Sequence, residues 1–145
     1  MKKLLLSSDG SENALRAAGF AAELVALAPD VKVTVLVVND ILEKMKYYSP
    51  LQTPVILEEV EVFFDEKVQD AMERTTAVFD KNKIKVDRVV KVGNPAQVIV
   101  DLAHDEGFDL IVIGSRGMGS LKGIVLGSVS SKVLQLANCP VTIVK

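Results

Sequence analysis

The sequence contains a single cysteine, a single histidine and no apolar run long enough to cross a membrane. With only Cys139, neither an internal disulfide nor a cysteine-based metal site can form, and we expect the thiol to pack as a small buried apolar group. His104 lies on the polar side of a predicted helix. The sequence contains neither a Ser-His-Asp arrangement nor an HExxH motif, so it gives no support for a hydrolase or a metalloenzyme. Apolar runs fall short of the ~18 to 20 residues of a membrane span. Residues 1–6 are too short for a signal peptide, so we expect a soluble cytoplasmic protein.

The chain also lacks an excess of charge of either sign. Its 17 basic and 19 acidic residues give a formal net charge of -2 over 145 residues. No basic excess points to nucleic acid, and no acidic tail suggests a solvating role. A chain of this length fits one domain, residues 1–145, with an ordinary core. We therefore expect a single domain with neither a nucleic-acid nor a membrane partner.

Strand and helix patterns alternate along the chain. Strands are predicted at residues 3–8, 31–38, 84–92, 109–113 and 141–145, and helices at residues 11–27, 55–83, 95–106 and from Gly127 onward. Residues 39–54 are predicted to form a loop. Because crossovers between parallel strands are right-handed, this order indicates an α/β fold: an open, mostly parallel five-stranded sheet with helices on both faces.

Two glycine-containing segments form the most informative motif, Gly114 to Gly117 and Gly127-Ser128. The first follows a buried strand directly, and glycine lets backbone N–H groups face an anion where a Cβ would clash. The second opens a helix, whose start offers free N–H groups and a partial positive charge. The pattern predicts a cradle for nucleotide phosphates. Its spacing matches neither the dinucleotide fingerprint nor the P-loop; a purely structural glycine turn is the alternative.

Three predicted strand ends converge on this motif. Asp9, Asn39 and Gly114 follow the first, second and fourth strands, and open α/β sheets bind ligands at the carboxyl ends of strands where the strand order reverses. Asp9 is also a candidate cap for the first helix, as Ser128 is for the last. Arg116 and Lys122 supply local positive charge, either for phosphate or as ordinary surface residues.

Several segments resemble the ATP-binding universal stress proteins. They are residues 112–117, 126–130 and 139–141, which resemble the C-terminal signature of that family, and residues 4–11, 93–96 and 103–107. The resemblance fails only at about residues 41–54. It implies sheet order 3-2-1-4-5, as in the adenine nucleotide alpha-hydrolase-like fold, with the binding crevice between the first and fourth strands.

The resemblance also implies ATP, accompanied by Mg²⁺, as the ligand. The residues expected to hold it are Ser7, Ser8, Asp9, Val38, Ile113, Gly114, Arg116, Gly117, Gly127, Ser128, Val129 and Ser130. The phosphates would be surrounded by the backbone of Gly114, Gly117, Gly127, Ser128 and Val129, with hydroxyl donors from Ser128 and Ser130. Asp9 would meet the ribose or a metal-bound water, and the backbone of Val38 would meet the adenine edge.

We expect the protein to act as a nucleotide-dependent regulatory module of the stress response. An exposed strand at residues 141–145 would be covered by self-pairing, and the resembled family forms such dimers, so we expect a homodimer through this strand. Two alternatives stay open. One is slow ATP hydrolysis or autophosphorylation at Ser128 or Ser130, for which only Asp9 offers a candidate base. The other is a nucleotide-independent dimeric scaffold.

Overall fold

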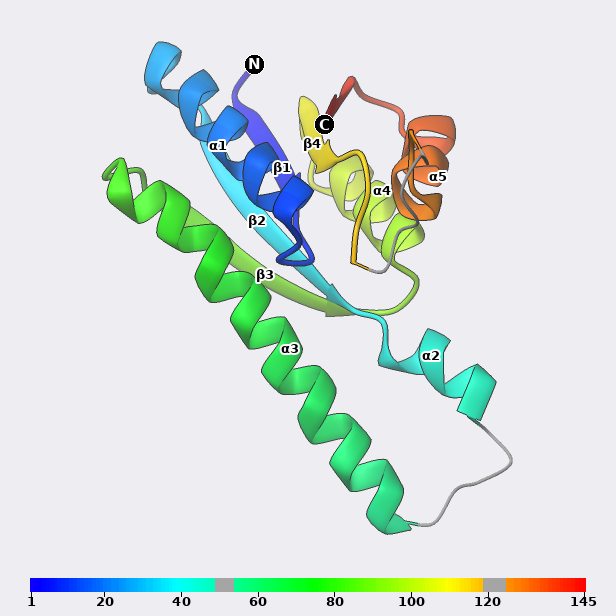
Figure 1. Ribbon diagram of the computed structural model, residues 1–145. Helices are drawn as coiled ribbons and strands as arrows, with labels where there is room; N and C mark the ends of the chain where they lie inside the picture. The colour runs from blue at the N-terminus through cyan, green and yellow to red at the C-terminus, as the bar shows by residue number, and fades with distance from the viewer. Residues whose placement is uncertain (49–53, 119–124) are drawn as a thin grey trace.

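The structure is a computed structural model that describes residues 1–48, 54–118 and 125–145 (Figure 1). Its elements are β1 Lys3–Ser7, α1 Glu12–Leu27, β2 Lys32–Asn39, α2 Ile41–Tyr48, α3 Pro54–Lys81, β3 Val86–Val92, α4 Pro95–Asp105, β4 Leu110–Gly114, α5 Ser128–Leu136 and β5 Val141–Val144. All strand pairs are parallel, in the order β3-β2-β1-β4-β5. The predicted fold class and sheet order are therefore confirmed.

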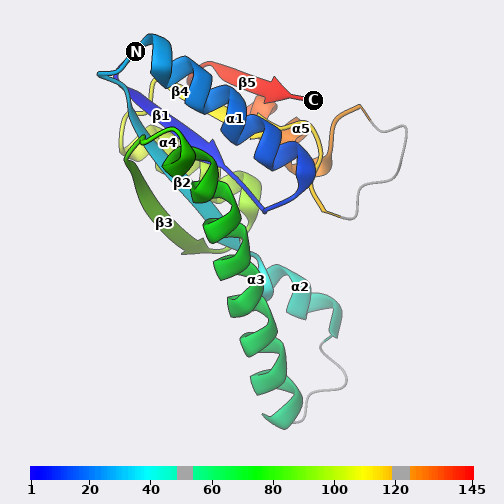
Figure 2. The same cartoon turned by 60° about the vertical axis from the view of Figure 1, so that its left-hand side comes forward.

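The central strand shows why the sheet is covered on both faces. Leu4, Leu5 and Leu6 of β1 are all fully buried, and successive residues of a strand point to opposite faces. Leu4 and Leu6 join the core under α1 and α3, while Leu5 joins the core under α4 and α5. Figures 1 and 2 show these two pairs of helices on opposite faces. A strand without a polar face is typical of a parallel sheet between helical layers.

The predicted loop at residues 39–54 is wrong over α2, Ile41–Tyr48. Asn39 starts this helix, because its Oδ1 accepts the N–H of Ile41 at 3.0 Å, and the Ile41 side chain is buried. An i,i+4 ion pair between Asp40 and Lys44, 3.8 Å apart, spans the first turn. The short polar anchor and one buried residue stabilise an eight-residue helix, whose apolar residues Ile41, Leu42 and Met45 already recur at helical spacing in the sequence. Residues 49–53 lie outside the described residues.

Two boundaries of the long helix also differ from the prediction. The helix α3 begins at Pro54. Proline is well tolerated there because the N–H that it lacks would have no partner within the helix at this position. It ends at Lys81 rather than at residue 83, since Lys83 adopts φ +56, which a helix cannot continue. The strand β3 consequently starts at Val86, two residues later than predicted.

Residues 54–67 of α3 and the whole of α2 extend past the carboxyl edge of the sheet (Figures 1 and 2). We call these two segments the arm. Because the arm leaves the sheet on the side where the strands end, it lies beside the region in which the predicted site residues meet.

Two remaining features concern hydropathy and the single cysteine. Within residues 1–48, 54–118 and 125–145, no helix has both the length and the apolar character of a membrane span. Cys139 is half-buried rather than fully buried and packs against the core under α4 and α5. Burial raises the pKa of its thiol, which disfavours the reactive thiolate.

The start of β1 is tied to the start of β4 by a carboxylate. Asp109 Oδ2 accepts the N–H of Lys2 at 2.6 Å and that of Lys3 at 2.9 Å. Both hydrogen bonds favour the ionised form, so they hold the pKa of Asp109 below its ordinary value.

This lowered pKa predicts how stability depends on pH. The contribution of Asp109 is present above the ordinary carboxyl pKa of about 4 and is lost as the pH falls through the lower folded value. We expect the difference in free energy of unfolding between wild type and Asp109→Asn, measured by urea denaturation, to be larger at pH 6 than at pH 3. An exposed carboxylate, Asp105, serves as the control through Asp105→Asn. An equal difference at both pH values for Asp109→Asn would contradict this assignment.

Candidate functional site

The carboxyl ends of β1, β2 and β4 open onto a cavity of about 250 Å³. All twelve residues predicted for the site line it: Ser7, Ser8, Asp9, Val38, Ile113, Gly114, Arg116, Gly117, Gly127, Ser128, Val129 and Ser130. The cavity lies where the strand order reverses, between β1 and β4, which is the usual ligand position in open α/β sheets. The structure therefore brings together residues that are distant in sequence.

The start of α5 contributes amide groups to this cavity. Gly127 is the N-cap residue, and the helix begins at Ser128. The N–H groups of Ser128, Val129 and Ser130 have no acceptor among the described residues, as expected for the first turn of a helix. Free N–H groups together with the positive end of the helix dipole favour an anion.

The hydroxyl of Ser130 has a different role from the one predicted. It donates to the carbonyl oxygen of Ser115 at 2.8 Å, and the N–H of Gly127 donates to the same oxygen at 2.7 Å. Ser130 is only 2% exposed. In this structure both groups therefore join the two glycine segments instead of facing the cavity. Ser128 makes no capping hydrogen bond, so the capping alternative for its side chain is wrong and its exposed hydroxyl remains a candidate donor.

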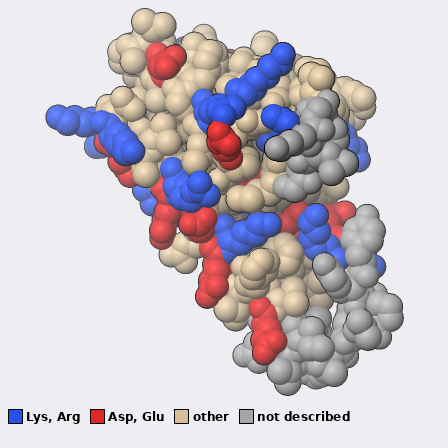
Figure 3. Space-filling model, viewed as in Figure 1, with Lys and Arg blue, Asp and Glu red and all other residues tan. Residues whose placement is uncertain are grey.

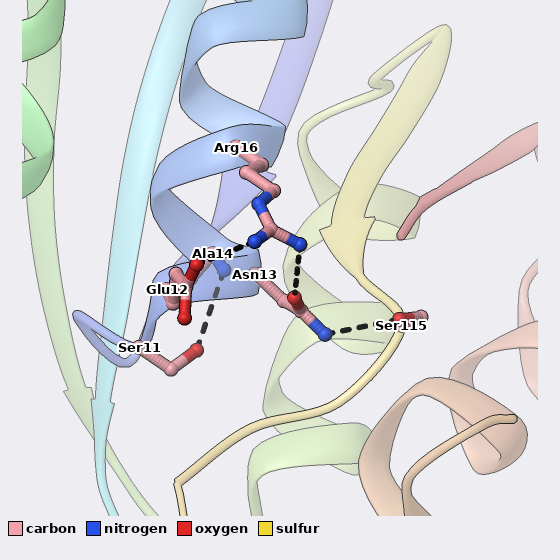
Figure 4. Close-up of polar contacts among 6 residues, drawn as sticks. All are labelled: Ser11, Glu12, Asn13, Ala14, Arg16 and Ser115. Carbon is pink, nitrogen blue, oxygen red and sulfur yellow. Dashed lines mark hydrogen bonds and ion pairs between the residues drawn. The ribbon is translucent and has the colours of Figure 1, made fainter. Parts of the chain in front are cut away.

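Ser115 also connects this loop to α1 and β5. Its Oγ accepts a hydrogen bond from Asn13 Nδ2 at 3.1 Å, and Arg16 donates to the Asn13 oxygen at 3.3 Å (Figure 4). Its N–H donates to the carbonyl oxygen of Val144 at 2.7 Å. Asn13 and Ser115 were not predicted as site residues. The available signal in the sequence was the spacing of Asn13 with Ala17 and Ala21, which places it on the face of the helix that packs against the sheet. An amide buried on that face needs hydrogen-bond partners.

Two glycines of the loop are required by close approach. A Cβ on Gly114 would lie 2.8 Å from the backbone carbon of Asn13, so Gly114 lets α1 pack directly against the end of β4. A Cβ on Gly117 would lie 2.5 Å from the Asp9 carboxylate. Gly127 is less constrained: its extended backbone suits any residue, and its added Cβ would approach Arg116 Cα at 3.4 Å.

Asp9 joins the turn after β1 to the glycine loop. Its Oδ1 accepts the N–H of Ser11 at 3.0 Å, and its Oδ2 accepts the N–H of Met118 at 2.9 Å. The N-cap of α1 is Ser11, whose Oγ accepts the N–H of Ala14, so the alternative that Asp9 caps α1 is wrong. Asp9 is exposed and lines the cavity. Each carboxylate oxygen retains further lone pairs for a ligand.

Ser8 is held by the neighbouring helix. Its Oγ donates to Thr75 Oγ1 at 2.7 Å, Thr75 donates in turn to the carbonyl oxygen of Ala71, and Gly10 N–H donates to Ser8 Oγ. Ser7 and Ser8 are both buried. These contacts give the floor of the cavity a fixed polar surface.

The arm adds a wall that the sequence prediction missed. The cavity is lined by Asp40, just before α2, by Lys44 of α2, by Phe64 and Lys67 of the arm, and by the adjoining Val68 of α3. The residues from α3 recur at helical spacing with the buried Ala71, so they share the face that packs toward the sheet. That periodicity was visible in the sequence, but it indicated burial and gave no sign of a cavity.

The charges around the cavity are mixed. Lys44 pairs with Asp40, whereas Arg116 and Lys67 have no ion pair within 4.0 Å among the described residues. Lys122 lies outside the described residues. Figure 3 shows basic and acidic side chains interspersed over this face of the molecule. In the part of the chain that the structure describes, no three acidic, histidine or cysteine side chains are grouped to hold a metal ion.

The fold and the site define an open α/β sheet protein with an anion-favouring cavity at its switch point. Comparison with known proteins identifies the family: the sequence profile of the Universal stress protein family matches residues 1–145. The chain belongs to the universal stress protein family.

Individual members of this family are similar to this chain over nearly its full length. The universal stress protein in the QAH/OAS sulfhydrylase 3′ region of Thermus aquaticus is 36% identical, covering 99% of this chain and 98% of that protein. The universal stress protein YxiE of Bacillus subtilis is 33% identical, with coverage of 99% and 98%. The solved structure of MJ0577 superposes with a TM-score of 0.78 at 31% identity, covering 99% of this chain and 95% of that one.

Two more distant structures contain nucleotides. A universal stress protein in complex with cAMP has a TM-score of 0.69 at 21% identity, covering 99% of this chain and 97% of that chain. An Arabidopsis thaliana family protein, At3g01520, with AMP bound has a TM-score of 0.70 at 20% identity, with coverage of 100% and 92%. At these identities the likeness to this chain is one of fold.

The two close-approach glycines predict different consequences of adding a methyl group. We expect Gly114→Ala to lower the free energy of unfolding by about 1–3 kcal/mol, because its Cβ meets fixed helix backbone. Gly117→Ala should cost less, since its Cβ meets only the Asp9 side chain, which can move at the expense of its hydrogen bond with the Met118 N–H. Gly19→Ala, in α1 with no atom within 4 Å of its added Cβ, should stabilise by about 0.5–1 kcal/mol. Urea denaturation measures all three, and a smaller loss for Gly114→Ala than for Gly117→Ala would refute the ranking.

Proposed function

We propose that this protein is a cytoplasmic ATP-binding regulatory module of the stress response, with the nucleotide in the cavity between β1 and β4. The observation that carries the proposal is the convergence of unpaired α5 amides with the glycine loop on that cavity. Such an arrangement suits the oxygens of a polyphosphate. In the proposed mode, the amides of Ser128 and Val129 bind phosphate, and Arg116 neutralises part of its charge.

The relatives and the cavity lining support an adenine nucleotide in particular. Two proteins of this fold are described with cAMP and with AMP. In this chain the β2 end supplies Val37 and Val38, and Ile113, Val129 and Pro95 complete an apolar lining. An apolar slot next to a few polar groups is the usual form of a small-ligand site.

Mg²⁺ is part of the proposal as a companion of the nucleotide. Mg²⁺ keeps several waters and takes one or two carboxylates besides phosphates. Asp9 contacts the glycine loop, where it accepts the Met118 N–H, so it fits a position next to a metal-bound water. The metal supplies charge neutralisation to the phosphates.

The contacts of Asp9 favour binding over hydrolysis. Both of its oxygens already accept backbone N–H groups, and this arrangement stabilises the ionised carboxylate and fixes its position. A carboxylate held in this way acts first as a structural link between two loops. We therefore propose regulation by occupancy of the site, with slow ATPase activity as the alternative to be tested.

A negative charge introduced at the helix start tests nucleotide binding. We expect Ser128→Asp to weaken Mg·ATP binding at least tenfold, about 1.4 kcal/mol, because the new carboxylate would occupy the phosphate position. The fold should be retained, since an acidic residue in a first helical turn is stabilising by about 0.3–1 kcal/mol. Calorimetric titration of nucleotide-free protein with Mg·ATP measures the affinity.

Gln135→Glu is the matched control, because it adds the same charge at an exposed position near the far end of α5. Its affinity should equal that of wild type. Chromatography of the recovered nucleotide separates a binding protein, which returns intact ATP, from an ATPase. Absence of binding by wild type in both calorimetry and equilibrium dialysis would favour the scaffold alternative.

We also propose a homodimer through β5. Both β3 and β5 are edge strands, but β3 carries exposed Asp87, Arg88 and Lys91, which oppose pairing with another strand. In contrast, β5 has the uncharged sequence VTIV. The better edge for self-association is therefore the C-terminal one.

Proline scanning of the two edges tests this interface. Ile111 N–H donates to Pro140 O and Ser115 N–H donates to Val144 O, so the N–H of Ile143 points away from β4. We expect Ile143→Pro to yield monomers in sedimentation at micromolar concentration, because the free edge loses a donor. Val90→Pro, at the outward side of β3, should remain dimeric. Monomeric wild type, or equal effects of both variants, would refute the β5 interface.

A further inference from the structure

Two phenylalanines of this protein lie outside the packing of the core, and one of them lines the cavity. Of the five phenylalanines, Phe79 and Phe108 are buried, and Phe20 packs against the core under α1 and α3. The other two, Phe63 and Phe64, lie on the arm. Phe63 is 59% exposed, whereas Phe64 is half-buried, belongs to neither core cluster and lines the cavity.

The surroundings of Phe64 hold its ring in a defined position. The rings of Phe63 and Phe64 meet edge to face, with centroids 5.7 Å apart and planes at 83°. The Lys67 ammonium lies 6.0 Å from the centroid of Phe64, within the range of a weak cation–π contact. One turn further along α3, Val68 reaches the same cavity. An aromatic ring held between neighbours loses little entropy when a ligand packs on it.

The lining of the cavity also matches a flat apolar ligand. Val37 and Val38, at the end of β2, line it together with Phe64. The phosphate-favouring amides of α5 line another part of the same cavity. A ligand with a planar aromatic part and an anionic part therefore has a complementary surface for each.

We propose that Phe64 is the base-stacking residue of the site, and that the arm thereby reads the nucleobase of the bound nucleotide. This inference rests on the proposed nucleotide binding and adds a residue from α3 to a site otherwise built from strand ends and the glycine loop. Stacking of a base on an aromatic side chain contributes substantially to affinity and tolerates any purine. Phe64 thus selects for a base and leaves recognition of phosphate number to α5.

Two alanine substitutions on α3 test the proposal. Phe64→Ala should weaken Mg·ATP and AMP to a similar degree, about tenfold each, by the typical range for loss of a base stack. Val62→Ala, two residues away on the same helix, exposed and outside the cavity lining, should bind both as wild type does. Phe64→Tyr should restore affinity, because it keeps the ring. Equilibrium dialysis of each variant, with circular dichroism to verify the fold, gives these ratios.

The absence of tryptophan from the chain permits a direct optical readout. Phe64→Trp places a single tryptophan at the wall, and its fluorescence should change on addition of Mg·ATP, AMP or adenosine but not of inorganic tripolyphosphate. Val62→Trp, at an exposed position outside the cavity lining, should respond to none of them. A tripolyphosphate response equal to that of ATP would indicate closure of the arm without stacking and would overturn the proposal.

The outcomes separate this inference from the function on which it rests. If wild type binds Mg·ATP and Phe64→Ala binds it equally well, the stacking role is wrong while nucleotide binding stands. If wild type binds no nucleotide, both fail together. A loss confined to ATP, with AMP affinity unchanged, would also overturn the proposal, because it would assign the arm to the phosphates.

Discussion

The carbonyl oxygen of Ser115 accepts the N–H of Gly127 and the hydroxyl of Ser130, and the site depends on this pair of hydrogen bonds. They bring the end of β4 against the start of α5, so the free amides of the helix and the glycine turn face one cavity. The oxygen belongs to a residue that is only 2% exposed, where hydrogen bonds are stronger and their loss is more costly than at the surface. Without this closure, the anion-favouring groups would not be adjacent.

A second constraint is the short distance between α1 and β4. It exists because Gly114 has no side chain, and because Ala17 and Ala21 place only methyl groups between the helix and the sheet. The same approach lets Asn13 reach Ser115, whose N–H is bonded to the end of β5. Ser115 is therefore hydrogen-bonded both to the start of α5, which lines the proposed nucleotide site, and to the end of β5, the proposed dimer edge.

The parts of the site that were predictable are those defined by local chemistry. A glycine directly after a buried strand and a second glycine at a helix start are local sequence signals. The loop at Gly114 and the helix start at Gly127 were therefore recognisable. Hydrogen-bond partners were not predictable, because a serine or aspartate has several within reach. Ser130 was predicted to face the ligand and instead binds Ser115. The structure also shows Asp9 linking two loops.

The sequence alone determined the α/β class, the order of the sheet through a family resemblance, and the position of the glycine loop. Periodicity and glycine placement are local properties, and they are read over a few neighbouring residues. Tertiary structure decided which side chains from distant segments meet. It alone showed that α2 forms within residues predicted to be a loop, and that Phe64 and Lys67 of α3 line the cavity. Those contacts depend on how far a long helix extends past the sheet, which no local pattern encodes.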